Sequence, residues 1–201
     1  MKKIVFIFCC FIAFSCSSKK GVVEAKKETV AKEKVVVAKV KEEVQKKVTA
    51  MKDASGNLVG YADKESFNQI PYSAWFKSNH KAYNTDSETI AKIKEPIKAL
   101  KVRAFMGTWC GDSKRETPRF YKVLEEADFN FDNLELITLN RSKRTPDNLQ
   151  QGHNVIRVPT FIFYKDGKEI GRYVEYPRET LEKDILKIVT QQPYKHSYDR
   201  S

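Results

Sequence analysis

The chain has 201 residues, and its composition excludes several classes of protein. An aromatic content of 11% is too high for a fully disordered chain, and eight glycines and seven prolines exclude a collagen-like or low-complexity scaffold. Four cysteines are too few for a miniprotein held together by disulfides. The length allows one domain of ordinary size with additional segments, or two small domains.

The formal net charge of +11 first suggests a nucleic-acid partner, but the distribution of the charge argues against one. Residues 1–50 hold 12 lysines and 5 glutamates, whereas residues 51–201 hold 25 lysines and arginines against 21 acidic residues. Most of the excess therefore belongs to the N-terminal segment. A nucleic-acid-binding domain carries its basic face or motif on the folded part. We find neither, and we expect no nucleic acid among the partners.

The first 20 residues are typical of an export signal. Two lysines precede an apolar run over residues 4–14, which is only about half the length that a membrane-spanning helix needs. Small residues at positions 13 and 15 lie just before Cys16, a pattern that resembles the lipobox of bacterial lipoproteins. The resemblance implies a signal peptide over residues 1–15, lipid attachment at Cys16, and a place in the cell envelope facing the periplasm, on the inner or the outer membrane. A plain signal peptide or a short membrane anchor is the alternative.

Residues 16–50 are predicted to form a lipid-anchored spacer. From residue 19 on, they are nearly all Lys, Glu, Val and Ala, without an aromatic residue. Val30, Val37 and Val44 stand seven apart, which is compatible with a helix that carries a narrow apolar stripe. The stripe is too short and too interrupted to predict a coiled coil. We interpret the segment as a charged, partly helical tether.

A folded domain is predicted over residues 51–195, followed by a tail over residues 196–201. A turn cluster at residues 53–57 opens the domain. The elements that follow are typical of an α/β fold with a mixed sheet. In chain order they are helices 71–83 and 86–100, strand 101–106, helix 112–127, strand 134–139, helix 146–152, strands 160–164 and 169–174, and helix 178–191. The pair Asp166-Gly167 between the last two strands is a strong hairpin signal.

The candidate reactive group is Cys110, at the junction of a predicted strand and a predicted helix. Once the signal is removed and Cys16 is lipidated, Cys110 is the single free thiol, so no internal disulfide is expected. A thiol at a helix N-terminus faces free backbone N–H groups and the positive end of the helix dipole. That position favours the nucleophilic thiolate. The polar sequence directly after Cys110 favours an accessible thiol over an inert buried one.

The segment around Cys110 resembles the active site of the thioredoxin superfamily. Trp109, Cys110 and Gly111 match the family motif Trp-Cys-Gly-x-Cys, with Asp112 at the variable position. Pro118 stands eight residues after the cysteine, where the family has a helix-kinking proline. The resemblance implies that Gly111, Asp112 and Pro118 support this motif.

The resemblance continues along the chain. Val158, Pro159 and Thr160 resemble the family's cis-proline segment, which lies beside the active-site thiol, and the matches together cover residues 100–192. They imply a thioredoxin-like α/β/α sandwich with a central mixed sheet, here with an N-terminal helical extension. A set of matches in order is more specific than a lone three-residue motif.

Three departures from the family pattern bear on function. Ser113 replaces the family's second cysteine, and Ala104 replaces its buried acid six residues before the first cysteine. Glu175 stands where the family has a glycine in the substrate groove, just before the last helix. In the family the buried acid is linked to proton removal from the second cysteine. The first two departures therefore agree with each other, and they favour a site that works with a single thiol.

The function that the resemblance implies is thiol–disulfide exchange, of isomerase or reductase type, on disulfide- or thiol-containing proteins of the cell envelope. Cys110 is expected to be the nucleophile and Ser113 its hydrogen-bond partner. The expected substrate-binding residues are Trp109, Val158, Pro159 and Thr160. Without a second cysteine, release of the substrate needs an external thiol donor or a partner oxidoreductase.

A function of a different class stays open. Ser113, Ala104 and Glu175 also permit a redox-inactive binding module or chaperone with the same fold, tethered to the membrane. No metal or organic cofactor is expected, because the three histidines are scattered and form no cluster with cysteine. Among them, His153 is expected either to approach Cys110 or to be a solvated loop residue.

Overall fold

The structure, a computed structural model, describes residues 49–200, which form a mixed six-stranded sheet with the strand order β1-β2-β4-β3-β5-β6. The strands are β1 (Met51–Lys52), β2 (Leu58–Ala62), β3 (Lys101–Met106), β4 (Leu134–Thr138), β5 (Thr160–Lys165) and β6 (Lys168–Val174). The α-helices are α2 (Tyr72–Ala82), α3 (Ser87–Ile97), α4 (Gly111–Glu126) and α5 (Leu181–Val189), with 3-10 helices η1 (Glu65–Phe67) and η2 (Phe131–Asn133). The expected signal peptide, Cys16 and nearly all of the spacer lie outside the described residues. No helix within residues 49–200 is both long enough and apolar enough to cross a membrane.

Strand β3 is the centre of the sheet, because it pairs with strands on both sides. It runs parallel to β4, with Val102 opposite Leu134, and antiparallel to β5, with Phe105 opposite Thr160. Alternate residues of a strand point to opposite faces, so a strand of this kind contributes to two cores. Ala104 belongs to the core under the helices, and Phe105 belongs to a second cluster on the other face.

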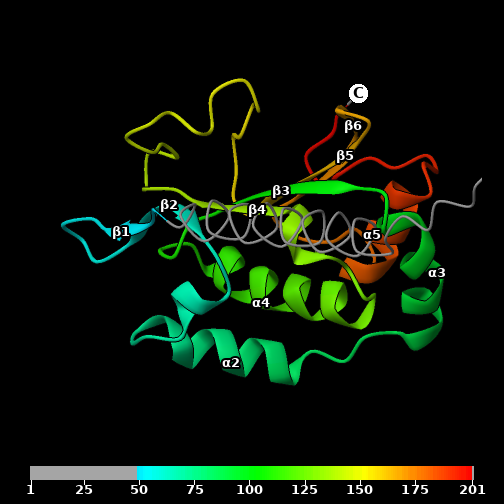
Figure 1. The fold of residues 1–201 in the computed structure, drawn as a ribbon, viewed down its shortest axis with the longest axis horizontal. Coiled ribbons are helices and arrows are strands. Elements are labelled where there is room, and N and C mark those ends of the chain that lie inside the picture. The colour runs from blue at the N-terminus through cyan, green and yellow to red at the C-terminus, as the bar shows by residue number, and fades with distance from the viewer. Residues whose placement is uncertain (1–48, 201) are drawn as a thin grey trace, which may run out of the picture. The chain divides into compact units, whose positions relative to one another are not determined.

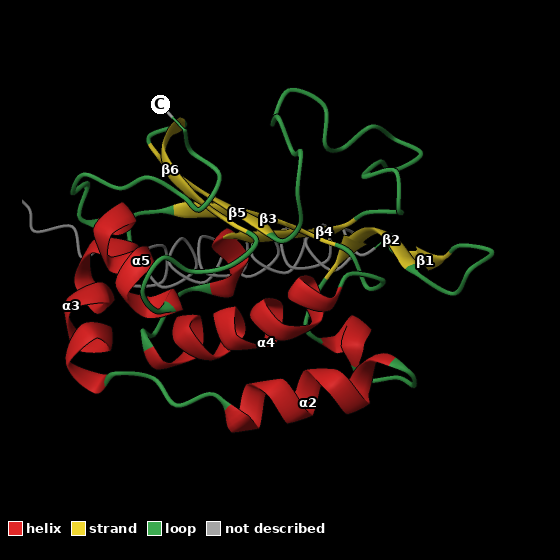
Figure 2. Cartoon of the chain, turned by 180° about the vertical axis from the view of Figure 1, so that it is seen from behind, coloured by secondary structure: helices red, strands yellow, loops and turns green. Residues whose placement is uncertain are grey.

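The described helices pack together on one face of the sheet (Figure 1). The view from behind shows the same arrangement, with α4 next to the sheet and α2 outside it (Figure 2). Phe120 of α4 stacks on Phe161 of β5 at 4.0 Å between ring centroids, and Phe161 in turn stacks on Tyr173 of β6 at 5.2 Å. These three fully buried rings fix the distance between α4 and the sheet, and burial of aromatic area is a large stabilising contribution.

The opposite face of the sheet carries the connection between β4 and β5, which loops above the strands (Figure 1). Leu149 and Val155 from this connection pack against the second cluster. The helix predicted over residues 146–152 is wrong, since this stretch consists of turns. Asn148 has φ +53° and Gly152 has φ +80°, which an α-helix does not allow.

The other predicted elements are present, with ends that differ by up to three residues. The helices predicted over residues 71–83 and 86–100 are α2 and α3, and Pro96 is the penultimate residue of α3. The hairpin prediction is confirmed, because Asp166 and Gly167 both have positive φ, +50° and +78°. The mixed sheet with flanking helices confirms the predicted α/β fold.

Candidate active site

The candidate site lies at one edge of the sheet, where four segments meet. The carboxyl ends of β3 and β4 and the amino end of β5 share this edge, because β3 is parallel to β4 and antiparallel to β5. Cys110 follows β3, Lys143 follows β4, Val158 precedes β5 and Glu175 follows β6. All four residues line one pocket of about 440 Å³. The predicted motifs, far apart in the sequence, are therefore brought together.

Cys110 is the N-cap of α4, as the sequence predicts. Its backbone is extended, with φ −88° and ψ 129°, and the helix begins at Gly111. The carbonyl of Cys110 accepts a hydrogen bond from the Lys114 N–H at 3.0 Å, the first bond of the helix. The side chain is partly exposed. The sulfur is thus accessible from the pocket and lies where unpaired helix N–H groups and the helix dipole favour negative charge.

The sulfur of Cys110 lies against the segment that resembles the cis-proline loop. Its thiol donates a hydrogen bond to the Val158 carbonyl over 3.3 Å, and the peptide bond between Val158 and Pro159 is cis. The side chains of Val158, Pro159 and Thr160 are all buried. Of this segment, the backbone therefore borders the sulfur, while the side chains anchor the loop in the core.

Ser113 lies one turn into α4 and is fully buried. Its hydroxyl oxygen accepts a hydrogen bond from the Gly107 N–H at 3.1 Å, so its partner within residues 49–200 is not the predicted Cys110. A hydroxyl that accepts a bond keeps its own proton available. A hydrogen bond from Ser113 to the thiolate of Cys110 therefore stays a prediction.

Trp109 forms a fixed wall of the pocket. Its indole N–H donates to the Leu139 carbonyl at 2.8 Å, and the guanidinium of Arg141 lies over its ring at 5.5 Å from the centroid. Gly107 makes room for the ring, because a Cβ at this position would lie 2.6 Å from indole atoms. Trp109 lines the pocket, and its role in substrate binding stays a prediction.

The motif-supporting residues take different positions. Asp112 forms an ion pair with Arg115 at 2.7 Å, and Gly111 is exposed with no atom within 4 Å of where its Cβ would be. Pro118 is buried inside α4, and Ala104 is fully buried below the site. The place of the family's buried acid is therefore occupied by a methyl group in an apolar setting.

Glu175 has a left-handed backbone, with φ +66°, at the position where the resemblance expects glycine. Glycine adopts this conformation without strain, whereas other residues rarely do. The Glu175 N–H donates to the Pro159 carbonyl at 2.8 Å, and the carboxylate pairs with Arg157 at 3.3 Å. The departure thus replaces an open groove position with a charged side chain beside the cis-proline segment.

The C-terminal segment predicted as a tail packs back against this place. Arg157 lies over the ring of Tyr198 at 3.9 Å, and Ser197 donates to the Tyr176 carbonyl at 2.6 Å. A hydrogen bond to the Glu175 carboxylate, followed by burial, raises the pKa of Tyr198 to about 12. Tyr198 therefore stays protonated at physiological pH and helps to hold the acidic side chain of Glu175.

Sequence reasoning missed four residues of the site: Lys143, Ile156 and Arg157, which line the pocket, and Tyr198, which contacts Arg157. Lys143 has φ +57° in a tight turn closed by Asn140, whose carbonyl accepts from the Lys143 N–H at 2.8 Å. An asparagine directly after a strand is a turn signal that was available in the sequence. Nothing in the sequence of the last residues points to a contact between Tyr198 and the site.

His153 takes neither of its two expected places. It lies in a separate pocket at the other end of the strands, where its Nε2 is 2.5 Å from the Arg103 guanidinium and its Nδ1 is 3.1 Å from the Tyr164 hydroxyl. Burial, followed by the positive charges of Arg103 and Arg172, lowers the pKa of His153. Within residues 49–200, no group of three or more His, Cys, Asp or Glu side chains is arranged to hold a metal ion.

Comparison with known sequences defines the family. The family model described as Thioredoxin matches residues 65–187. A thioredoxin-like protein of Acanthamoeba polyphaga mimivirus is 31% identical over 94 residues, which are 47% of this chain and 66% of the viral protein. A thioredoxin of Staphylococcus epidermidis is 32% identical over 98 residues, 48% of this chain and 86% of the relative. The chain belongs to the thioredoxin family.

A solved structure is similar in fold. A protein of unknown function from Pseudomonas aeruginosa superposes with a TM-score of 0.50 at 14% identity, over 65% of this chain and 92% of that one. Membership in the thioredoxin family supports thiol–disulfide redox chemistry as the general function of the domain.

Proposed function

We propose that the protein performs thiol–disulfide exchange through Cys110 alone, as an oxidoreductase or isomerase of the single-thiol type. The observation that carries the proposal is the position of the sulfur. It caps α4, is reachable from the pocket, and lies 3.3 Å from the Val158 carbonyl next to the cis peptide bond. An extended client peptide that reaches the sulfur through the pocket would lie along the backbone of this segment.

The chemistry follows from a single thiol. The Cys110 thiolate attacks one sulfur of a substrate disulfide, a new S–S bond forms, and the second substrate sulfur leaves as a thiolate that takes a proton from water. Because position 113 is serine, the mixed disulfide is resolved by another thiol. When that thiol belongs to the substrate, the result is isomerisation, and when it belongs to an external donor or a partner oxidoreductase, the result is reduction.

The proposed localisation of the protein is the bacterial cell envelope. The export signal over residues 1–15 and the lipobox-like sequence before Cys16 support lipid attachment and a periplasm-facing domain. The clients are then disulfide- or thiol-containing envelope proteins. The spacer over residues 16–50 gives the domain reach above the membrane to which it is anchored.

The test is to trap mixed disulfides in cells. The full chain and its Cys110→Ala variant are expressed at equal levels, thiols are quenched with acid, and the envelope proteins are separated on non-reducing gels. Wild type is expected to form higher-mass species that reductant removes and that the variant lacks. Pro159→Ala, which keeps the thiol but alters the neighbouring loop, should change the yield or pattern of these species. If wild type and Cys110→Ala give the same gel, the exchange role is wrong.

The alternative is a redox-inactive binding module. One observation favours it. Glu175, paired with Arg157, lines the pocket at a position where the resemblance expects glycine. The two functions differ in the behaviour of the thiol. Alkylation of Cys110 by iodoacetamide at pH 6.5, much faster than that of free cysteine, supports exchange, whereas alkylation at or below the free rate supports the module.

A further inference from the structure

The pocket beside Cys110 is lined by charged residues of both signs. Lys143 and Arg157 contribute positive charge, and Glu175 contributes negative charge. A charge beside a reactive sulfur selects among charged substrates. A substrate of opposite charge meets the site faster, and a substrate of like charge meets it more slowly. The question is which of these charges is free to act on a substrate.

The acidic groups at the site are already engaged. The Glu175 carboxylate pairs with Arg157 at 3.3 Å and bonds to the Tyr198 hydroxyl. Asp112, next to the reactive sulfur in sequence, pairs with Arg115 at 2.7 Å. Each of these negative charges is offset by a guanidinium.

Lys143 is a positively charged residue of the pocket whose ammonium is not neutralised by an ion pair within residues 49–200. It lines the pocket together with Cys110, and it forms no ion pair with any residue in the described part of the chain. Its position is fixed, because the turn is closed by a bond from the Lys143 N–H to the Asn140 carbonyl at 2.8 Å, by a bond from the Arg144 N–H to the Asn140 side chain at 2.9 Å, and by a bond from the Asn140 N–H to the Arg144 carbonyl at 3.1 Å. A half-buried lysine on a turn that is held by these bonds is suited to binding an anion.

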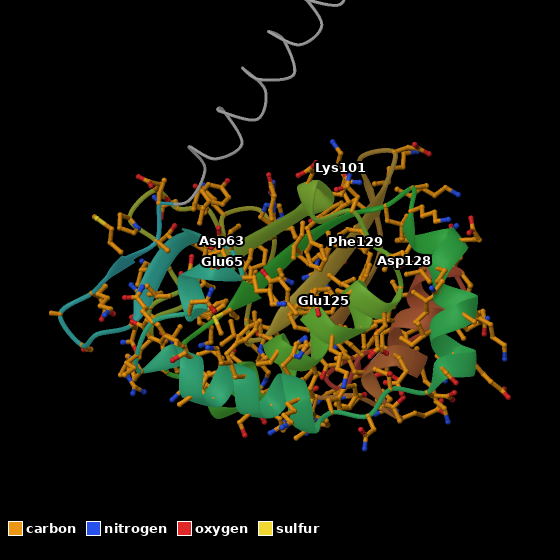
Figure 3. All side chains as sticks on the ribbon, turned by 60° about the horizontal axis from the view of Figure 1, so that its bottom comes forward. Asp63, Glu65, Lys101, Glu125, Asp128 and Phe129 are labelled. Carbon is orange, nitrogen blue, oxygen red and sulfur yellow. The ribbon has the colours of Figure 1, made fainter. Side chains whose placement is uncertain are left out.

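Other acidic side chains lie far from the sulfur. Glu65 lies in η1 and Asp63 just before it, and Glu125 and Asp128 lie near the carboxyl end of α4, the end opposite to Cys110 (Figure 3). Glu125 pairs with Lys64 and Asp128 pairs with Lys94. At physiological salt, the length of a 16-residue helix screens the charges at that end from the sulfur.

We propose that the site prefers sulfur substrates with a carboxylate close to the disulfide, and that Lys143 is the specificity-determining residue that binds the carboxylate. This inference rests on the proposed exchange function. In the step it governs, the Cys110 sulfur bonds to one substrate sulfur while the substrate S–S bond breaks. The carboxylate-bearing fragment either stays on Cys110 or leaves as a thiolate that takes a proton from water. In both cases Lys143 neutralises the charge that the substrate brings into the pocket.

The experiment compares three small disulfides of different charge. The full chain, with Cys9, Cys10 and Cys16 replaced by serine, reacts in mild detergent with 3,3′-dithiodipropionate, 2-hydroxyethyl disulfide or cystamine, and adducts at Cys110 are followed by mass spectrometry. The Lys143→Glu variant is measured in parallel. The intrinsic reactivity of each disulfide cancels when the variant is divided by wild type. The anion-to-cation rate ratio is expected to fall by roughly tenfold in Lys143→Glu at low salt, and by much less in 0.5 M salt.

A matched control carries the same change of charge. Lys165→Glu reverses an exposed lysine at the other end of β5 and should leave the ratio near the wild-type value. Lys143→Arg should keep the preference. An unchanged ratio in Lys143→Glu, or an equal fall in Lys165→Glu, overturns the inference. Failure of wild type to react even with the neutral disulfide would instead overturn the proposed function.

A further arm separates the two sources of such a substrate. Two peptide disulfides of equal length carry either glutamate or lysine next to the cysteine. A preference for the glutamate peptide identifies acidic client segments as the substrates. A preference confined to dithiodipropionate identifies a small acidic thiol as the donor that resolves the mixed disulfide. Both results support the carboxylate preference, and the absence of a preference in both arms overturns it.

Discussion

The two segments that form the site differ in how the chain holds them. Residues 107–113 join β3 directly to α4, and their conformation follows from a helix start and from a glycine that makes room for Trp109. Residues 139–159 are an irregular connection, held by side chains that bond to nearby backbone, as Thr145 does to the Leu149 N–H at 2.9 Å. The first segment supplies the sulfur and the second supplies the groove. The position of the thiol thus follows from local sequence signals, whereas the pocket around it depends on long-range packing.

The largest expected effect comes from restoring a second thiol in the first segment. Ser113→Cys gives a Cys-x-x-Cys motif, and attack by a thiol within the same motif has a far higher effective concentration than any external donor. Trapped mixed disulfides should fall by roughly tenfold or more relative to wild type, measured on acid-quenched non-reducing gels. Ser113→Thr keeps a hydroxyl and serves as the control. An unchanged yield of adducts in Ser113→Cys would show that position 113 does not reach the mixed disulfide.

Truncating a side chain in the core that supports both segments should lower the free energy of unfolding more than truncating one in either segment. Phe120 is fully buried and stacks on Phe161, so Phe120→Ala should cost about 3–5 kcal/mol in the free energy of unfolding. Lys143→Ala, a change within the connection, should stay within about 0.5 kcal/mol. Urea unfolding of both variants measures the difference. Similar losses for the two would mean that the connection, and not the ring stack, limits stability.

Within the first segment, two glycines differ in the room that they leave for a side chain. Gly107→Ala places a methyl group 2.6 Å from the Trp109 ring and should cost about 1–3 kcal/mol while shifting the tryptophan emission. Gly111→Ala adds a methyl group in open space at the first residue of α4, and it should be neutral or stabilising by up to about 1 kcal/mol. Fluorescence and urea unfolding in a Trp75→Phe background give both readings. Equal losses for the two variants would contradict the described packing of Trp109.

In the second segment, Asn140 closes the turn that carries Lys143. Asn140→Ala removes the side-chain acceptor of the Arg144 N–H and should cost about 0.5–1.5 kcal/mol of stability. It should also weaken the preference for anionic disulfides without changing the rate with the neutral one. Asn140→Asp, which keeps an acceptor oxygen, is the matched control for the turn. A lower rate with all three disulfides would mean that the turn supports the sulfur rather than substrate charge.

The smallest effect is the pH dependence of the second segment. The pKa of His153 is lowered from its ordinary value of 6.5, first by burial and then by Arg103 and Arg172. As the pH falls through 6.5, His153 binds a proton in the unfolded chain before it does so in the folded chain. The stability that neutral His153 contributes is therefore present above pH 6.5 and is lost as the pH falls below it. His153→Gln should flatten the fall of the urea midpoint between pH 7.5 and 5.5. The pKa of His196 is lowered as well, so His196→Gln shows how much of the slope belongs to the tail.

Much of the fold could be predicted from the sequence, because strands, caps and the Asp166-Gly167 turn carry local signals. The exception was the helix expected over residues 146–152, where residues with left-handed backbone bend the chain into turns. The sulfur and its cis-proline neighbour were predicted from motifs. The ion pair of Arg157 with Glu175 and the return of Tyr198 to the site were not, because tertiary packing creates these contacts and no local pattern marks them.

The central claim is that the fold itself makes Cys110 a nucleophile. The most direct test compares the same sulfur with and without the fold, by following adduct formation with 2-hydroxyethyl disulfide at neutral pH in buffer and in unfolding urea. The full chain with Cys110 as its single cysteine is used in both conditions. The folded protein is expected to react roughly tenfold faster or more. A folded protein that reacts no faster than the unfolded one would contradict the claim.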